Sequence, residues 1–227
     1  MAKPIIRISN LTVGYNFPLL DRINLEIQPG EIVAIVGISG LGKTTLLRTI
    51  AGVIPKLSGQ IVGDIRARGG IGYIPQRLGL VRHASVYHNV ELGARCGVKV
   101  RTDSGNLLDW SKRKSVVIRD CVAQVGLSDK INEPIRRLSG GQQRRVATAR
   151  TIAQKPQLIL ADEFLSELDK ENADSIISLM KNYVNENQCA MLLVEHHIER
   201  AEQIADRIID LSEFEIKSPA ELSLIHI

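Results

Sequence analysis

The sequence predicts an α/β fold in which a doubly wound parallel sheet carries an antiparallel β subdomain at its edge and an inserted helical lobe. Continuous apolar runs, as expected for parallel strands covered on both faces, occur at residues 32–36, 158–161 and 190–194. Polar residues follow each run at once. This repeated order of apolar strand and polar tip predicts ligand-binding residues at the carboxyl ends of the strands.

The segments around these runs predict the other two parts of the fold. Apolar and polar residues alternate between residues 5 and 27, most clearly at Ile23, Leu25 and Ile27, which indicates half-buried antiparallel strands. Between about residues 80 and 153 the apolar runs stop, and helical spacing takes their place. We therefore expect an inserted helical lobe there.

One domain is expected for residues 1–221, with a core of residues 1–79 and 154–221 and a helical subdomain of residues 80–153. The last six residues, 222–227, read as the translation of a transposon adapter used in sequencing libraries, so we expect a non-native tail. An ordinary amphipathic tail is the alternative.

Composition excludes several classes of protein. The chain has 227 residues with 44% apolar and 24% charged residues, and no apolar run approaches the roughly 18 residues that span a bilayer. The N-terminus lacks the apolar region of a signal peptide. Cys96, Cys121 and Cys189 are widely spaced and predict reduced thiols rather than a disulfide frame or a zinc site. With neither a signal peptide nor a long apolar run, we expect a cytoplasmic protein with no transmembrane segment of its own. Because the net charge of +4 comes from scattered clusters, we expect no nucleic-acid partner.

Residues 37–45, G-I-S-G-L-G-K-T-T, fit the pattern G-x-x-x-x-G-K-[ST] directly after a predicted strand. Gly37 and Gly42 let backbone N–H groups turn towards phosphate oxygens, and the following helix adds the positive end of its dipole. Lys43 is expected to reach the β- and γ-phosphates, and Thr44 to give its hydroxyl to Mg²⁺. An ordinary glycine-rich turn is the alternative, but the flanking strand and helix argue against it. The loop therefore predicts a nucleoside triphosphate site, and its remaining candidate binding residues are Ser39, Gly40 and Thr45.

Two acidic residues follow the second apolar run. Asp162 stands at the carboxyl end of the strand L-I-L-A-D, where it could bind the same Mg²⁺ directly or through water, and Glu163 comes next. A metal-bound carboxylate beside a free one suits the activation of water for in-line attack on a γ-phosphate, with Glu163 as general base. Two surface acids after a strand are the alternative. Together with the loop upstream, the pair predicts hydrolysis of the bound nucleotide.

The segment R-R-L-S-G-G-Q-Q-R-R-V-A-T-A-R predicts a second anion site. Ser139 and Gln142 have the spacing of a capping box, so Ser139 is expected to cap a helix. Gly140 and Gly141 leave the start of that helix without side chains, which suits it to bind an anion. A chain with one phosphate-binding loop does not need two such sites for its own nucleotide. A plain capped helix is the alternative.

At this segment the sequence resembles the ATP-binding-cassette (ABC) ATPases, whose signature motif is L-S-G-G-Q. The resemblance runs from about residue 5 to residue 211, with the motifs in the family's order. It implies a P-loop NTPase fold with a RecA-like core sheet, and two cassettes that sandwich two ATP molecules. In such a dimer Ser139, Gly141 and Gln142, together with Gly140, would contact the ATP held by the P-loop of the partner.

The resemblance also implies roles for four further residues. Tyr15 matches the aromatic residue that stacks on adenine, with packing at a strand end as the alternative. Gln76, in I-G-Y-I-P-Q, matches the glutamine that reaches Mg²⁺ and the attacking water, with a solvated amide as the alternative. Asp169, in S-E-L-D, matches a residue that organises the interface, a role compatible with capping the next helix. His196 matches the histidine that contacts the γ-phosphate and braces the glutamate; a metal site shared with His197 is rejected, because neighbouring side chains leave a strand on opposite faces.

Four residues depart from the family pattern. Phe164 stands where proline is usual, and Leu41 is bulkier than the usual small residue. Glu195 and His197 replace a common threonine or serine and an aspartate. None of these departures removes a catalytic group. We therefore expect them to affect the geometry of the loops and the rate of hydrolysis, but not the class of protein.

The resemblance implies an ATP-binding and ATP-hydrolysing subunit that energises an ABC transporter through ATP-driven dimerisation, with ATP and Mg²⁺ as cofactors. Its expected partners are a second copy or a paralogous ATPase subunit, and permease subunits at the cytoplasmic face of a bacterial or archaeal membrane. An importer is expected, since S-V-Y-H-N-V-E-L-G and I-L-A-D-E-F-L-S-E-L-D look like the phosphonate, taurine and nitrate group. An exporter or lipoprotein-release cassette, which shares I-L-A-D-E, and a soluble non-transport ABC ATPase remain the alternatives.

Within this interpretation, the segment from Gln76 to about Arg95 is expected to dock a short cytoplasmic helix of the membrane subunit. It opens the helical lobe and carries more apolar residues than a solvent loop needs. These are Leu78, Leu80, Val81, Val86 and Tyr87. The alternative is that all five belong to the core of the lobe.

Overall fold

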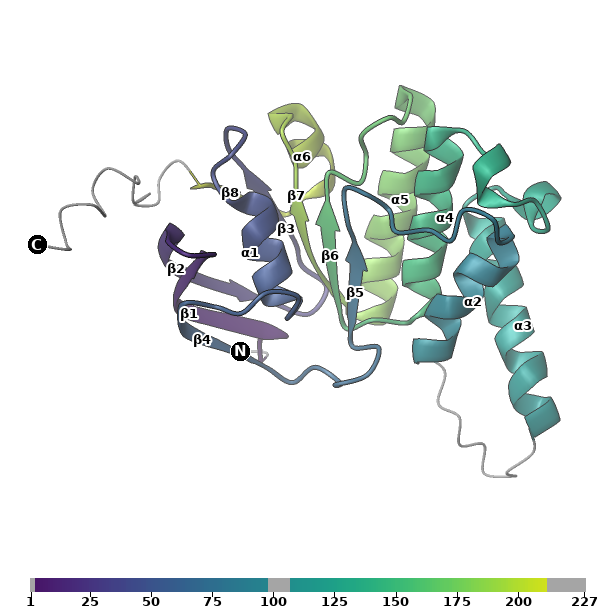
Figure 1. Cartoon of the computed structure of the whole chain (residues 1–227), viewed down its shortest axis with the longest axis horizontal. Coiled ribbons are helices and arrows are strands. Elements are labelled where there is room, and N and C mark those ends of the chain that lie inside the picture. Colours follow the sequence, from purple (N-terminus) through teal and green to yellow (C-terminus); the bar gives the residue numbers. More distant parts are fainter. Residues whose placement is uncertain (1–2, 98–106, 212–227) are drawn as a thin grey trace, which may run out of the picture. The chain divides into compact units, whose positions relative to one another are not determined.

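The computed structural model describes residues 3–97 and 107–211, without the side chains of residues 107–111 (Figure 1). The described residues form two compact units. The first contains residues 3–65, 160–163 and 184–211, and the second contains residues 66–97, 107–159 and 164–183. The predicted non-native tail, residues 222–227, lies outside the described residues.

The first unit contains the antiparallel sheet expected from the alternating segment. Its strands, in the order β2-β1-β4, are β2 (Pro18–Ile27), β1 (Ile6–Gly14) and β4 (Ser58–Gly63). Ile6 pairs with Ile27 and Ile8 with Leu25 across β1 and β2. In β2 the apolar residues Ile23, Leu25 and Ile27 are buried while the polar residues between them are exposed, so the predicted alternation is confirmed.

The same unit contains most of a parallel sheet. In spatial order its strands are β6 (Leu158–Asp162, of which residues 160–162 belong here), β7 (Ala190–Val194), β3 (Ile32–Val36) and β8 (Arg207–Asp210). Every residue of β3, β6 and β7 is buried, as their continuous apolar runs predict. β3 pairs in parallel with both β7 and β8, so the carboxyl ends of these strands lie at one edge.

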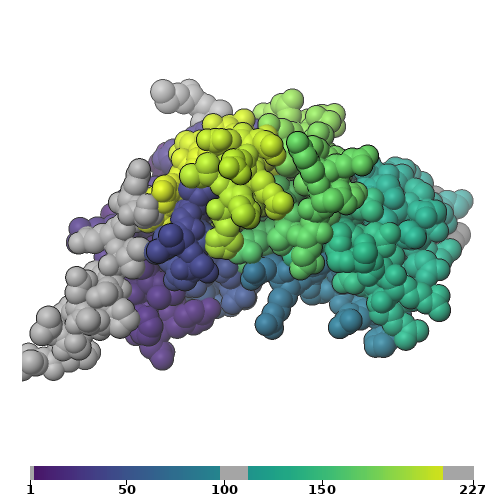
Figure 2. All heavy atoms as spheres, turned by 90° about the horizontal axis from the view of Figure 1, so that it is seen from above, coloured from purple at the N-terminus to yellow at the C-terminus, as the bar shows by residue number. Residues whose placement is uncertain are grey.

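Two helices of the first unit flank these strands. α1 (Lys43–Ile50) follows β3 and packs against β1, and α6 (Ile198–Ile204) follows β7 and packs against β3. Figure 2 shows the segment around α6, in yellow, beside the dark blue segment that includes β3 and the residues after it. The carboxyl ends of β3 and β7 and the start of α1 therefore lie close together.

The second unit is mainly helical. Its elements are β5 (Ile71–Ile74), α2 (Val86–Gly97), α3 (Leu107–Gln124), the 3-10 turns Ser128–Lys130 and Ile135–Arg137, α4 (Gly140–Ala153) and residues 170–183 of α5 (Lys170–Asn187). α2 packs on both α3 and α4. The predicted helical subdomain, residues 80–153, lies within this unit, and its limits stay a prediction.

Two glycines on one face of α2 let it approach α4 closely. A β-carbon on Gly93 would overlap the carbonyl oxygen of Arg150, and one on Gly97 would overlap that of Gln154. Because the two glycines are four residues apart, they lie one turn apart on the same face of the helix. The contact between these helices thus needs residues without side chains at both positions.

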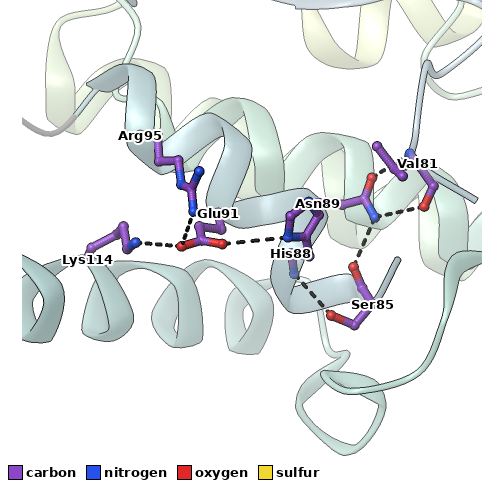
Figure 3. A network of polar contacts seen from close by, with 7 residues as sticks. All are labelled: Val81, Ser85, His88, Asn89, Glu91, Arg95 and Lys114. Atoms are coloured by element: carbon purple, nitrogen blue, oxygen red, sulfur yellow. Dashed lines mark hydrogen bonds and ion pairs between the residues drawn. The ribbon is translucent and has the colours of Figure 1, made fainter. Parts of the chain in front are cut away.

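A buried asparagine fixes the segment that enters α2 (Figure 3). The Oδ1 atom of Asn89 accepts from the backbone N–H of Val81 at 2.7 Å, and its Nδ2 atom donates to the carbonyls of Val81 at 3.2 Å and Ser85 at 2.9 Å. Asn89 itself is fully buried, whereas Val81 is 46% exposed. One side chain therefore holds the backbone of a residue whose own side chain faces solvent.

A second polar cluster joins α2 to α3 (Figure 3). Lys114 of α3 donates to Glu91 Oε1 at 2.5 Å, and Arg95 donates to the same oxygen at 3.1 Å. Burial acts to raise the pKa of Glu91, but these hydrogen bonds outweigh it and hold that pKa below its ordinary value. Glu91 therefore stays ionised and links the two helices. Within residues 3–97 and 107–211, no helix combines the length and the apolar character that a membrane span requires.

Replacement of Asn89 by alanine is expected to lower the free energy of unfolding by about 2 kcal/mol. The substitution removes three hydrogen bonds to the backbone of Val81 and Ser85, just before α2. Urea unfolding measures the change. Asn182→Ala, at an exposed position of α5, is the control and should shift stability by no more than about 0.5 kcal/mol. Equal effects of the two substitutions would contradict the structural role of Asn89.

Candidate functional site

The glycine-rich loop joins β3 to α1 in the first unit. Gly37, Gly40 and Gly42 have φ angles of 144°, 88° and 93°, in the region that residues with a β-carbon rarely adopt. Gly42 is the N-cap of α1 and supplies no side-chain cap. The N–H groups at the start of α1 are therefore available to an anion, as the sequence predicts. Ser39 and Gly40 are exposed, and Thr45 is buried within α1.

Lys43 lies folded back over this loop. Its Nζ atom donates to the carbonyl oxygens of Gly37 at 2.6 Å and Ile38 at 2.7 Å, and the residue is 5% exposed. Burial lowers the pKa of Lys43, against the attraction of Glu163, Asp162 and Asp210. The ammonium group thus braces the loop and adds positive charge where phosphates would be held.

Thr44 and Asp162 form an oxygen-rich pair suited to a hard cation. Thr44 Oγ1 donates to Asp162 Oδ1 at 3.1 Å, and Asp162 is 1% exposed. The second carboxylate oxygen, Oδ2, is buried without a hydrogen-bond partner among the described residues. Burial raises the pKa of Asp162, and the hydrogen bond from Thr44 opposes this rise. A hydroxyl and a carboxylate with unused acceptor capacity fit Mg²⁺, which prefers oxygen ligands.

Glu163 and His196 meet at the ends of neighbouring strands. His196 Nε2 lies 2.6 Å from Glu163 Oε1, and the Glu163 N–H donates to the carbonyl of Val194 at 3.1 Å. Glu163 has a φ of 51°, an uncommon conformation for a residue other than glycine. The histidine therefore orients the carboxylate next to the Thr44–Asp162 pair, while the exposed His197 is the N-cap of α6.

The signature segment forms a separate site in the second unit. Ser139 Oγ accepts from the Gln142 N–H at 3.3 Å and Gln142 Oε1 accepts from the Ser139 N–H at 3.0 Å, so the predicted capping box is confirmed. The start of α4 opens into a cavity of about 540 Å³ that Ser139, Gly140, Gly141 and Gln142 line with residues 167–169. α4 thus presents its N-terminus to an open space.

Asp169, at the edge of this cavity, caps α5. Its two carboxylate oxygens accept from the backbone N–H of Asn172 at 2.9 Å and from Asn172 Nδ2 at 2.7 Å. These hydrogen bonds lower the pKa of Asp169, so the carboxylate is fixed in its ionised form. Asp169 therefore caps the helix that follows it, as the sequence analysis allowed. Its expected role at a dimer interface is compatible with this capping and stays a prediction.

The predicted site residues fall into two groups. Lys43, Thr44, Asp162, Glu163 and His196 come together in the first unit, where Tyr15 is 55% exposed just after β1. The signature residues and Asp169 come together in the second unit, which also contains Gln76, exposed after β5.

Sequence reasoning missed two acidic residues. Asp210 ends β8 and attracts Lys43, and it could have been found because it follows an apolar strand as Asp162 does. Glu167 lines the signature cavity, and its signal was an acid beside Asp169 in S-E-L-D.

Comparison with known proteins decides the family. The model of the ABC transporter family matches residues 20–166, which is more than half of the chain. The chain belongs to the ABC transporter family. It is 36% identical to the hypophosphite import ATP-binding protein HtxD of Stutzerimonas stutzeri, over 96% of this chain and 68% of that protein. It is 35% identical to the phosphonates import ATP-binding protein PhnC 2 of Oceanobacillus iheyensis, over 93% of this chain and 88% of that protein.

The similarity of this chain to solved structures is consistent with its family. A dimeric ATP-binding cassette in a post-hydrolysis state, bound to ADP and Pi, has a TM-score of 0.79 and 28% identity, over 94% of this chain and 97% of that one. The predicted P-loop NTPase fold is therefore confirmed. As a member of the ABC family, this chain is an ATP-binding and ATP-hydrolysing subunit of an ABC transporter.

Replacement of Asp162 by asparagine is expected to stabilise the nucleotide-free ABC cassette at neutral pH while weakening Mg²⁺-dependent ATP binding. Because the folded-state pKa of Asp162 lies above the ordinary value of 3.8, the contribution of this residue to stability is most favourable below that value and declines as the pH rises from 3.8 through the folded-state pKa. The advantage of the variant should therefore grow from acid to neutral pH. Urea unfolding without nucleotide, at a series of pH values, measures it; equal stability at neutral pH would be the contrary result.

Proposed function

We propose that this chain energises an ABC importer by binding ATP with Mg²⁺, dimerising around it and hydrolysing it. The observation that carries the proposal is the placement of the Glu163–His196 contact beside the Thr44–Asp162 pair in one unit. A metal-binding carboxylate next to an oriented, ionisable glutamate is the arrangement that γ-phosphate hydrolysis needs.

In this proposal each residue near the P-loop has a distinct task. The N–H groups of residues 37–45 bind phosphate oxygens, and Lys43 neutralises the β- and γ-phosphates. Thr44 and Asp162 would hold Mg²⁺, which offsets the negative charge of the phosphates when bound. Glu163 accepts a proton from the attacking water, and His196 orients Glu163 and contacts the γ-phosphate. Gln76 would reach Mg²⁺ and the water, and Tyr15 would stack on adenine.

The signature cavity is proposed to take the ATP bound by a second ATPase subunit, either another copy of this chain or a paralogue. Support comes from the open N-terminus of α4, where Ser139, Gly140, Gly141 and Gln142 face the cavity. The dimeric cassette of similar fold adds support. Asp169 would organise the same interface.

The proposed direction of transport is import, and the proposed location is the cytoplasmic face of a bacterial or archaeal membrane. HtxD, PhnC 2 and a sulfate/thiosulfate relative of Pseudomonas aeruginosa are all named import ATP-binding proteins. Their substrates differ, in keeping with a solute that binds the membrane subunits rather than the cassette.

The proposed docking surface for a permease helix lies between Gln76 and Arg95. Val81 is 46% exposed, and Leu78, Leu80 and Tyr87 are partly exposed, whereas Val86 is fully buried and belongs to the core. Since Asn89 holds the backbone of Val81, the exposed valine is presented in a fixed position. A short apolar surface of this kind suits the side of an amphipathic helix.

Glu163→Gln should still bind ATP but hydrolyse it at least about 100-fold more slowly, because an amide cannot accept the proton of water. The stalled protein should accumulate as an ATP-bound dimer in size-exclusion chromatography with light scattering. Lys43→Ala, expected to abolish ATP binding, is the control and should stay monomeric. A Glu163→Gln protein that kept full turnover and stayed monomeric with ATP would refute the general-base role and the sandwich together.

Val81→Asp should leave basal ATPase within about twofold of wild type but reduce transport about tenfold and weaken co-purification with the permease, because a charge enters the apolar contact. Val116→Asp is the matched control, since Val116 is a 57% exposed valine on α3 outside the docking surface. Transport assays in reconstituted vesicles measure both. Undiminished transport by Val81→Asp, or an equal loss in Val116→Asp, would place the docking site elsewhere.

A further inference from the structure

Glu167 holds its carboxylate at the first residue of the signature helix. Its Oε2 atom lies so close to Gly140 that a methyl group on Gly140 would come within 2.7 Å of it. Gly140 is the first residue of α4, directly after the N-cap Ser139. A negatively charged group therefore already sits at the helix end that the proposed function gives to a phosphate of the partner's ATP.

The rest of the surroundings keep this carboxylate in place. Arg144 Nη2 lies 3.4 Å from Glu167 Oε1, and the Arg144 side chain is 5% exposed whereas that of Glu167 is 65% exposed. Glu167 also has a φ of 65°, a conformation that is costly for a residue with a side chain. The backbone turn places Glu167 in the lining of the cavity, and the ion pair with the buried arginine favours this position of the carboxylate.

We propose that Glu167 is an internal competitor for the anion site of the signature motif, which opposes entry of the partner's ATP and so sets the threshold for ATP-driven dimerisation. This inference rests on the proposed function, in which the cavity receives that ATP. The carboxylate places a negative charge beside the N-terminus of α4 while no phosphate is present, and it repels the triphosphate when the second cassette approaches. Dimerisation then requires the carboxylate to turn aside or to be screened.

The expected effect of the Glu167 charge on dimerisation is modest, because the carboxylate lies near solvent. Two unit charges about 4 Å apart in water-like surroundings change an equilibrium by about fivefold. Because a sandwich has two signature sites, removal of both carboxylates should tighten a homodimer by about 25-fold. Since the interaction is between partly exposed charges, it should weaken strongly as the salt concentration rises. A purely structural role of Glu167 would not give this salt dependence.

The test compares the ATP-dependent dimer dissociation constants of Glu163→Gln and Glu163→Gln/Glu167→Gln by sedimentation velocity. The amide keeps the size of the side chain and an oxygen that can accept from Arg144, while it removes the charge. Glu163→Gln/Glu186→Gln is the matched control, because Glu186 is exposed on α5, does not line the cavity and loses the same charge. Urea unfolding confirms that the variants are folded.

The expected result is a dimer about 25-fold tighter with Glu167→Gln at about 50 mM NaCl, with most of the difference lost at about 500 mM. The Glu186→Gln control should stay within about twofold of its parent. The monomer's affinity for ATP should not change. Equal or weaker dimerisation with Glu167→Gln, an equal gain in the control, or a gain insensitive to salt would overturn the inference and leave the proposed function intact. Failure of both Glu163→Gln and the double variant to dimerise with ATP would overturn the ATP sandwich and the inference with it.

Discussion

The parallel pairing of β3 with β7 is the constraint on which the proposed catalytic group of residues depends. Ile32 pairs with Met191 and Ile35 with Val194, and the ladder continues where the Glu195 N–H donates to the carbonyl of Ile35 at 3.0 Å. This register ends both strands at the same level. The glycine-rich loop after β3 and His196 after β7 are therefore delivered to one edge, where Asp162 and Glu163 at the end of β6 complete the group.

Two charged side chains at this edge are buried at an electrostatic cost to the folded protein. Lys43 and Asp162 are both nearly buried, and burial lowers the pKa of the lysine and raises that of the aspartate. Each shift records a charge that the nucleotide-free protein holds with incomplete compensation. A bound phosphate would satisfy Lys43, and a bound cation would satisfy the free oxygen of Asp162. Ligand binding therefore relieves strain that folding leaves in place.

The sequence was sufficient for features set by local patterns and insufficient for those set by packing. Buried strands, the capping box of Ser139 and Gln142, and the lysine of the loop follow from periodicity and fixed spacing. Asn89 was not predicted, because its partners are backbone atoms. Asp210 and Glu167 were not singled out, because an acid at a strand end or near Asp169 does not by itself show that it faces Lys43 or Gly140. No periodic signal distinguishes a buried asparagine that holds a loop from one that faces solvent.

The departure from the family at Phe164 illustrates how packing can replace a local rule. A proline at this position would restrict the backbone through its ring, and it would also restrict the residue before it. Phe164 is instead 1% exposed and among the largest fully buried side chains, so burial anchors the chain directly after Glu163. Glu163 has a left-handed φ of 51° and contacts His196. Since the contact depends on where the backbone is held and not on which residue holds it, a buried aromatic side chain at this position is compatible with the proposed catalytic geometry.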